Sequence, residues 1–126
     1  MAKLENTAFQ IQITPFVVPT TDGKYIGEHF GGASIDGNGL SIAHMKAPAG
    51  WSEPFQKPEF SEYTLVVKGR KLIEVDGKKI TLGPGESIRV EANHKVRYSN
   101  PFQEECEYIS VCNPAFDFNK VHREEN

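Results

Sequence analysis

The sequence predicts an all-β protein, either a β-sandwich or a β-barrel, and three observations support this. Eleven glycines and eight prolines divide the 126 residues into short segments. Several segments alternate apolar and polar residues with the period of two that is typical of strands. Asp76-Gly77 stands between two such segments, where it favours a tight type I′ hairpin because glycine tolerates positive φ. Many short strands separated by turns indicate a sandwich or a barrel.

The individual strands are bounded by turn residues. Phe9–Ile13 alternates strictly and ends before Pro15, and Tyr63–Lys68 is rich in β-branched residues and ends at Gly69. In the tail, residues 117–125 are predicted to form a short helix with Asp117 as its N-cap. The predicted strands are Phe9–Ile13, Leu40–Lys46, Tyr63–Lys68, Leu72–Val75, Lys79–Leu82, Ser87–Glu91, Val96–Ser99 and Tyr108–Cys112.

Composition places the chain among ordinary globular proteins. Hydrophobic residues make up 38% and charged residues 25%, and the net charge is −3. The absence of a long basic block argues against a nucleic-acid partner, and the apolar stretches are too short to span a membrane. The first residues show no apolar signal segment, so the expected location is the cytoplasm.

The two cysteines agree with a cytoplasmic location. Cys106 and Cys112 lie in one predicted strand, where a six-residue separation corresponds to roughly 20 Å. A disulfide requires Cα atoms within about 4.4–6.8 Å. Both are therefore expected to be free thiols, and their spacing is not a zinc pattern.

The segment from Gly50 to Gly69 resembles the first motif of the cupin family. That motif consists of a glycine, five residues, His-x-His, three or four residues, a glutamate, six residues and a glycine. Glu62 stands at the glutamate position relative to Gly69, and Gly50 at the opening glycine. The second motif begins with a glycine and ends with an asparagine, and Gly85 and Asn100 stand at the matching distance.

The resemblance, carried by about residues 40–112, implies a cupin-type jelly-roll β-barrel. On this basis residues 1–126 form a single cupin domain with a barrel core over about 40–112. An N-terminal strand segment over 9–18 and a short, partly helical C-terminal tail over 113–126 complete it. Small cupins commonly dimerise by sheet pairing, so a homodimer is expected, with the strand at Phe9–Ile13 and the apolar Phe116 and Phe118 as candidate contacts.

The usual cupin metal ligands, two His and one Glu from the first motif and one His from the second, do not carry over as a set. Only Glu62 stands at a ligand position. With three intervening residues, the His-x-His positions are Gln56 and Pro58; with four, they are Phe55 and Lys57. The second-motif position is Val96. The cofactor is therefore expected to be none or an unidentified divalent metal, held if at all by Glu62, Gln56, Glu59 and His44, an oxygen-rich set that suits hard cations.

Glu62 and Tyr98 are the candidate catalytic residues. The cupin register points Glu62 into the barrel, where a partly apolar cavity raises the pKa of a carboxylate without a partner and suits it to acid–base work. Tyr98, inward on the second-motif strand, is the candidate acid. Binding of a small polar ligand is expected from Gln56, Glu59, Glu62, His44, Tyr98 and Trp51.

Three functions stay open at this point. The first is binding of a small polar ligand in the cavity without the usual His metal site. The second is an isomerase, epimerase or lyase that uses Glu62 as acid or base, with or without an unusual oxygen-rich metal site. The third is a structural role, with a barrel plugged by Phe55, Val96 and Tyr98. Fold alone does not decide among them.

Overall fold

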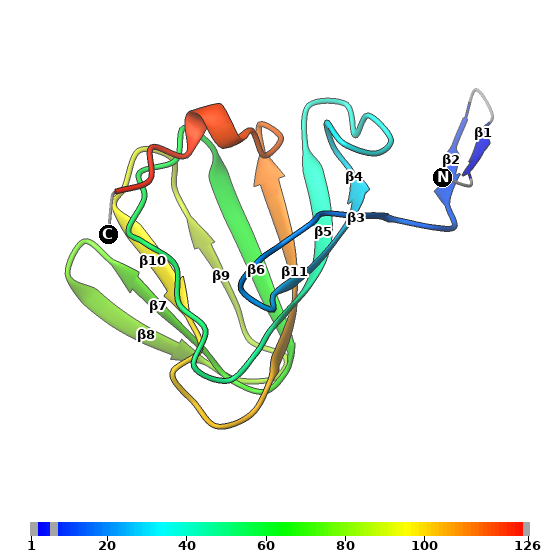
Figure 1. Ribbon diagram of the computed structural model, residues 1–126. Coiled ribbons are helices and arrows are strands. Elements are labelled where there is room, and N and C mark those ends of the chain that lie inside the picture. The colour runs from blue at the N-terminus through cyan, green and yellow to red at the C-terminus, as the bar shows by residue number, and fades with distance from the viewer. Residues whose placement is uncertain (1–2, 6–7, 125–126) are drawn as a thin grey trace.

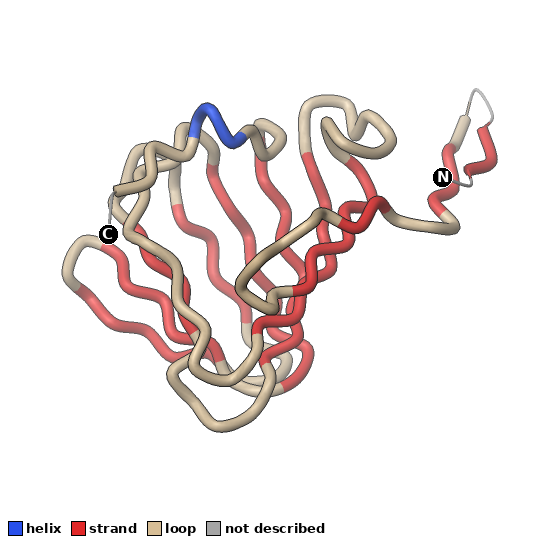
Figure 2. The backbone as a smooth tube through the Cα atoms, viewed as in Figure 1, coloured by secondary structure: helices blue, strands red, loops and turns tan. Residues whose placement is uncertain are grey.

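The computed structural model describes residues 3–5 and 8–124 of the chain, which consist almost entirely of strands and loops (Figures 1 and 2). The strands are β1 (Lys3–Glu5), β2 (Gln10–Gln12), β3 (Phe16–Val17), β4 (Tyr25–Phe30), β5 (Ser41–Ala47), β6 (Ser61–Lys68), β7 (Lys71–Val75), β8 (Lys78–Leu82), β9 (Ser87–Val90), β10 (Val96–Ser99) and β11 (Cys106–Asn113), and a 3₁₀ helix, η1, covers Phe118–Lys120. The all-β prediction is confirmed.

Two antiparallel sheets form the body of the molecule. The larger has six strands in the order β3-β4-β5-β11-β6-β9, and the smaller has three in the order β10-β7-β8. The two sheets face each other, and the β1–β2 hairpin lies apart from both (Figure 1). In the large sheet, β11 pairs with β5 and β6, and β6 pairs with β9, so strands distant in sequence are neighbours, as in a jelly roll.

The apolar core occupies one end of the space between the sheets. Val66 on β6, Ala47 on β5 and Cys106 on β11 are buried in one cluster with Ile73 of the smaller sheet. At the opposite end of the same three strands, Cys112 pairs with both Glu62 and Ser41. Because side chains alternate along each strand, one inward face thus changes from apolar to polar along its length.

All eight strands predicted from the sequence are present with small shifts at their ends. The Asp76-Gly77 turn has φ values of 49° and 83°, as a type I′ turn requires. β3 falls within the predicted N-terminal strand segment over 9–18, whereas β1 and β4 were not predicted from the sequence. β4 contains Gly27, which has no side chain to continue the alternation of apolar and polar residues. Because glycine is also depleted in strands, the sequence of β4 gives only a weak strand signal.

The C-terminal tail folds back over one end of the barrel. Its helix is only the one-turn η1, shorter than predicted, but Asp117 caps it as expected by accepting from the Asn119 amide at 2.9 Å. Backbone hydrogen bonds join the tail to residues 55–59, including Lys57 N to Val121 O at 2.9 Å. Phe116 packs on Phe60 with ring centroids 5.6 Å apart.

The N-terminal hairpin leaves apolar side chains in solvent. Phe9, Ile11 and Ile13 are each more than two-fifths exposed, and Phe118 at the other end of the chain is 65% exposed. The expected homodimer would cover such residues, and it stays a prediction. The described residues include no helix that is long and apolar enough to cross a membrane.

Adjacent valines on β6 give a matched test of this fold. Val66 is 1% exposed in the core, whereas Val67 is 46% exposed on the outer face. Val66→Ala is expected to lower the free energy of unfolding by about 2 kcal/mol, through lost burial and a residual cavity. Val67→Ala is expected to cost no more than about 1 kcal/mol. Urea denaturation measures both, and equal losses would contradict the inward–outward assignment of β6.

Candidate functional site

A cavity of about 520 Å³ lies between the sheets and is lined by side chains from both of them. The large sheet contributes alternate residues of β4, β5 and β11 together with Glu62 from β6, and the smaller sheet contributes Lys71 from β7 and Tyr98 from β10. Two loops, one through Asp22 and one through Glu53, and the C-terminal tail with Arg123 complete the walls. The barrel is therefore not plugged, and the purely structural alternative loses its main support.

Glu62 lines this cavity at the start of β6. Its Oε2 accepts a hydrogen bond from the Ser110 hydroxyl at 2.6 Å, across the β6–β11 pair. Ser110 and Cys112 point into the cavity from β11 together with Tyr108. The inward orientation of Glu62 that the cupin register implied is present in the structure.

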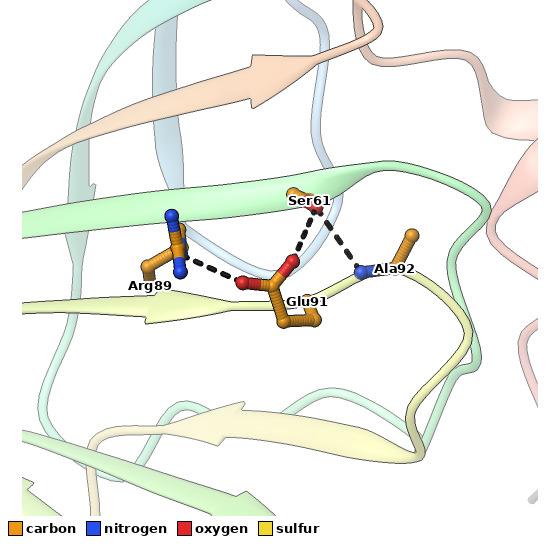
Figure 3. A network of polar contacts seen from close by, with 4 residues as sticks. All are labelled: Ser61, Arg89, Glu91 and Ala92. Atoms are coloured by element: carbon orange, nitrogen blue, oxygen red, sulfur yellow. Dashed lines mark hydrogen bonds and ion pairs between the residues drawn. The ribbon is translucent and has the colours of Figure 1, made fainter.

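The start of β6 is held by a small polar network outside the cavity (Figure 3). The Ser61 hydroxyl accepts from the Ala92 amide at 3.2 Å and donates to Glu91 at 3.4 Å. Arg89 pairs with the other Glu91 oxygen at 2.7 Å and is exposed. This network fixes Ser61, the residue next to Glu62, and it keeps the Arg89 guanidinium paired with Glu91 at the surface.

Two lysines bring positive charge to the cavity. Lys71 is 2% exposed, and its Nζ lies 3.2 Å from the centroid of the Tyr108 ring and 4.6 Å from that of Tyr98. The Lys24 Nζ lies 4.3 Å from the Trp51 ring centroid. Among the described residues, neither ammonium group has a hydrogen-bonding or ion-pairing carboxylate.

Burial shifts the pKa of both lysines downward. Desolvation is the largest cause for Lys71, and together with the neighbouring positive charge of Lys24 it lowers the pKa to about 7, while Glu62 and Glu53 act in the opposite direction. Desolvation is also the main reason that the Lys24 pKa is lowered, against the attraction of Glu53 and Glu62. The cavity is thus apolar enough to disfavour charge.

Glu53 and the two tyrosines respond to the same environment. Burial raises the pKa of Glu53, with Lys24 opposing and Glu62 reinforcing the rise. Burial raises the pKa of Tyr98 and Tyr108 well above the ordinary value, so both phenols stay protonated. In the described part of the chain, the two phenolic oxygens and the Glu53 Oε2 are buried without a hydrogen-bond partner.

Trp51 and Gln56, both predicted as ligand-binding, also line the cavity. The Trp51 indole donates to Asp22 at 2.7 Å, so its role in the free protein is to fix the 19–24 loop. Gln56 is 4% exposed and accepts from Arg123 at 3.1 Å. Gln56, rather than Phe55, therefore lies at the cavity, which favours the shorter of the two motif registers.

His44 and Glu59 lie outside the cavity, which corrects the expectation for both. Ser41 and Ala43 face inward from β5, so the intervening period of two turns His44 to the other face, where its Nε2 bonds Glu107 at 2.7 Å. Glu59 is exposed and pairs with His122. The four proposed metal ligands are consequently not brought together.

The donor set of the cavity does not fit a divalent cation. Lys24, Lys71 and Arg123 line the same cavity as Glu53 and Glu62, and positive charges in a poorly hydrated site repel a metal ion. None of the described lining residues is a histidine. Across the described residues, no three His, Cys, Asp or Glu side chains form a group that could hold a metal.

Four residues that line the cavity were not predicted from the sequence: Lys24, Glu53, Lys71 and Tyr108. The sequence carries a signal for Lys71, because Lys71 lies two residues before the apolar Ile73 and therefore on the same face of β7. Lysine is rarely buried, however, and the predicted strand begins at Leu72. Lys24 precedes the strand that was not predicted. Glu53 precedes the oxygen donors Gln56, Glu59 and Glu62 in sequence, but a loop glutamate is ordinarily assigned to solvent.

Comparison with known proteins identifies the family. The cupin domain family (Cupin_2) matches residues 43–112. The chain belongs to the cupin family. This cupin has the predicted jelly-roll fold, and solved structures support it. A PAC13 variant from Streptomyces, solved with uridine, matches with a TM-score of 0.72 and 15% identity over 91% of this chain and 88% of that one. KdgF from Halomonas sp. matches with a TM-score of 0.69 and 16% identity over 81% and 88%.

Two further relatives extend the comparison. A cupin-superfamily sugar phosphate isomerase from Silicibacter pomeroyi matches with a TM-score of 0.62 and 14% identity over 73% of this cupin and 60% of that chain. In sequence, a Myxococcus xanthus protein described as "Endoribonuclease YbeY" is 42% identical over 108 residues. That match covers 86% of this cupin but only 37% of the Myxococcus protein. The structural likenesses, at these identities, show the fold alone.

Replacing Lys71 by methionine is expected to change how stability depends on pH. The folded protein releases the Lys71 proton at a pKa of about 7, whereas the ordinary lysine value is 10.5, so between these values the unfolded chain binds more protons. Lys71 therefore makes wild-type stability rise with pH in this window, by up to about 1.4 kcal/mol per pH unit. Lys71→Met lacks this rise.

Urea unfolding at several pH values between 7 and about 8.5 measures the effect. This window lies below the pH at which buried groups with raised pKa values, such as Tyr98 and Tyr108, begin to titrate. The exposed Lys57, which does not line the cavity, supplies the control variant Lys57→Met, expected to keep the wild-type pH dependence. A Lys71→Met protein with the same slope as wild type would contradict the assignment.

Proposed function

We propose that this cupin binds a small, oxygen-rich organic ligand with an anionic or carbonyl group in the barrel cavity, without a metal ion. The observation that carries the proposal is the pair of lysine ammonium groups in a cavity of about 520 Å³, which contact aromatic rings but, among residues 3–5 and 8–124, no carboxylate directly. Cavities of this size suit drug-sized or smaller ligands. A ligand oxygen would supply the charge-assisted hydrogen bonds that the protein leaves open.

The aromatic and polar walls support the same ligand class. Trp51, Tyr98 and Tyr108 offer flat apolar faces for a sugar or heterocycle, while Glu62 and Gln56 offer acceptors for hydroxyl groups. The fold relatives are consistent with this choice, since one was solved with uridine and another is named a sugar phosphate isomerase. The proposed location stays the cytoplasm, with which two buried free thiols agree.

The nuclease activity named for the Myxococcus protein is not part of this proposal. This chain spans 37% of that protein's length, so the named activity belongs to a longer protein. The net charge of −3 offers no general attraction for a phosphate backbone. The cavity offers buried groups suited to one small molecule.

Acid–base catalysis by Glu62 is the second candidate, of the isomerase, epimerase or lyase type. Glu62 is oriented by Ser110 in the cavity, and the protonated Tyr98 lines the same space. Such a pair can remove a proton next to a carbonyl and donate one to oxygen. This candidate shares the ligand class of the first and adds a chemical step.

Lys24→Met is expected to weaken binding of an acidic ligand by at least about tenfold, or roughly 1.4 kcal/mol, because it removes a charge-assisted contact. Calorimetry with D-glucuronate, glucose 6-phosphate and uridine measures the affinity. The exposed Lys57→Met protein is the matched control and is expected to bind as wild type does. Failure of all three compounds to bind wild type, or unchanged affinity in Lys24→Met, would count against the proposal.

Glu62→Gln separates binding from catalysis. If Glu62 transfers protons, turnover of a bound compound is abolished while affinity stays within about tenfold. NMR of the ligand follows turnover and calorimetry follows affinity. The control is Glu59→Gln, which changes an exposed carboxylate outside the cavity. Equal loss of affinity and turnover in Glu62→Gln would assign Glu62 to binding alone.

A further inference from the structure

Lys71 is held in an unusual setting for a lysine. It is the first residue of β7, where it pairs with Leu82, so its backbone is fixed by the sheet. Its side chain extends between the two sheets to the Tyr108 and Tyr98 rings and is almost completely shielded from bulk solvent. Within the described residues, no carboxylate or carbonyl accepts a hydrogen bond from the ammonium group.

This setting disfavours the charged form of Lys71. Burial comes first among the causes, and the positive Lys24 adds to it, so the pKa falls to about 7. Roughly half of the molecules then carry a neutral amine at neutral pH, compared with a small fraction for a lysine of ordinary pKa. Burial and a neighbouring cation favour the neutral amine of a lysine, and this neutral form is the one that attacks a carbonyl carbon.

We propose that the Lys71 amine condenses with the carbonyl carbon of a small aldehyde or ketone held in the cavity and forms an imine with it. The inference rests on the proposed function, because the cavity must first hold an oxygen-rich ligand. It narrows the ligand class to carbonyl compounds, and it assigns Lys71 a covalent role that neither the binding proposal nor acid–base catalysis by Glu62 requires.

The step balances without an oxidant or a reductant. The Lys71 lone pair forms the C–N bond, the carbonyl π electrons move to oxygen, and that oxygen takes up a proton while nitrogen loses one. The carbinolamine hydroxyl then takes up a second proton and leaves as water, while nitrogen gives up its remaining proton and the C=N bond forms. One amine and one carbonyl thus give one imine and one water.

The cavity contains a source for the proton that the leaving hydroxyl needs. Burial raises the pKa of Glu53, so its carboxyl group retains a proton more readily than an exposed glutamate, and it is close enough to Lys71 to influence that pKa. Lys24 supplies a second amine that lines the same cavity and lies over Trp51. We assign Lys24 to an anionic group of the ligand and Lys71 to its carbonyl group.

Reductive trapping tests the inference on the full chain. The protein is incubated at pH 7 with pyruvate or D-glyceraldehyde and cyanoborohydride, which reduces an imine to a stable amine, and the modified lysine is located by peptide mass spectrometry. Lys71 is expected to be modified roughly tenfold faster than any exposed lysine. Lys71→Arg, which keeps the positive charge, is expected to lose the adduct, and Lys57→Arg is expected to retain it.

The pH profile separates a reactive amine from a merely accessible one. Trapping at Lys71 is expected to rise up to about pH 7–8 and then level off, while exposed lysines continue to gain reactivity at higher pH. Lys24→Met removes the neighbouring positive charge and is expected to move the Lys71 profile to higher pH. This second variant tests the inference even if Lys71→Arg does not fold.

Calorimetry of the same two probes without reductant distinguishes the inference from the proposed function. Binding to wild type without an adduct on Lys71 overturns the imine and leaves the cavity-binding proposal intact. Adducts spread over exposed lysines, with Lys71 unmodified, also overturn it. Absence of binding by these probes and by the acidic sugar, sugar phosphate and nucleoside compounds overturns the proposed function itself.

Discussion

Removing the Lys71 ammonium from water is the constraint on which the rest of the site depends. Desolvation of a single charge costs several kcal/mol, and a partner carboxylate at contact distance would normally offset it. Here two tyrosine rings face the nitrogen instead, and cation–π attraction offsets only part of that cost. The remaining difference appears as a lowered pKa of Lys71.

The scaffold that maintains this arrangement is the large sheet. β11 lies between β5 and β6, so Tyr108, Ser110 and Cys112 are held in register with residues on both sides. Tyr108 places its ring under Lys71, and Ser110 orients Glu62. A single central strand thus positions both Glu62 and the Tyr108 ring that contacts the Lys71 ammonium group.

Segments without regular strand structure supply the other charged groups. Lys24 and Asp22 come from the loop before β4, which the Trp51–Asp22 hydrogen bond ties to the 48–60 segment. Arg123 comes from the C-terminal tail, held by backbone bonds such as Glu124 N to Phe55 O at 2.7 Å. The loop and the tail thus add Lys24 and Arg123 to the positive group that Lys71 supplies from β7, while the strands give the cavity its shape.

Some features were determined by the sequence alone. Alternation and turn residues located eight of the strands, the Asp-Gly turn and the Asp117 cap, because these depend on local backbone preferences. The resemblance to the cupin motifs, carried by the spacing of Gly50, Glu62 and Asn100, implied the cupin barrel and the inward direction of Glu62. Both are short-range properties, of one strand or of a motif with fixed spacing.

Only the tertiary structure decided which side chains meet. Lys24, Glu53, Lys71 and Tyr108 are separated in sequence and come together through pairing between distant strands and through loop docking. Alternation with a period of two divides the residues of a strand between two faces but does not say which face points inward. For this reason His44 was expected in the cavity, whereas it lies on the outer face of β5. A charged residue is ordinarily assigned to solvent, and the burial of Lys71 follows from packing against the tyrosine rings, which no local pattern records.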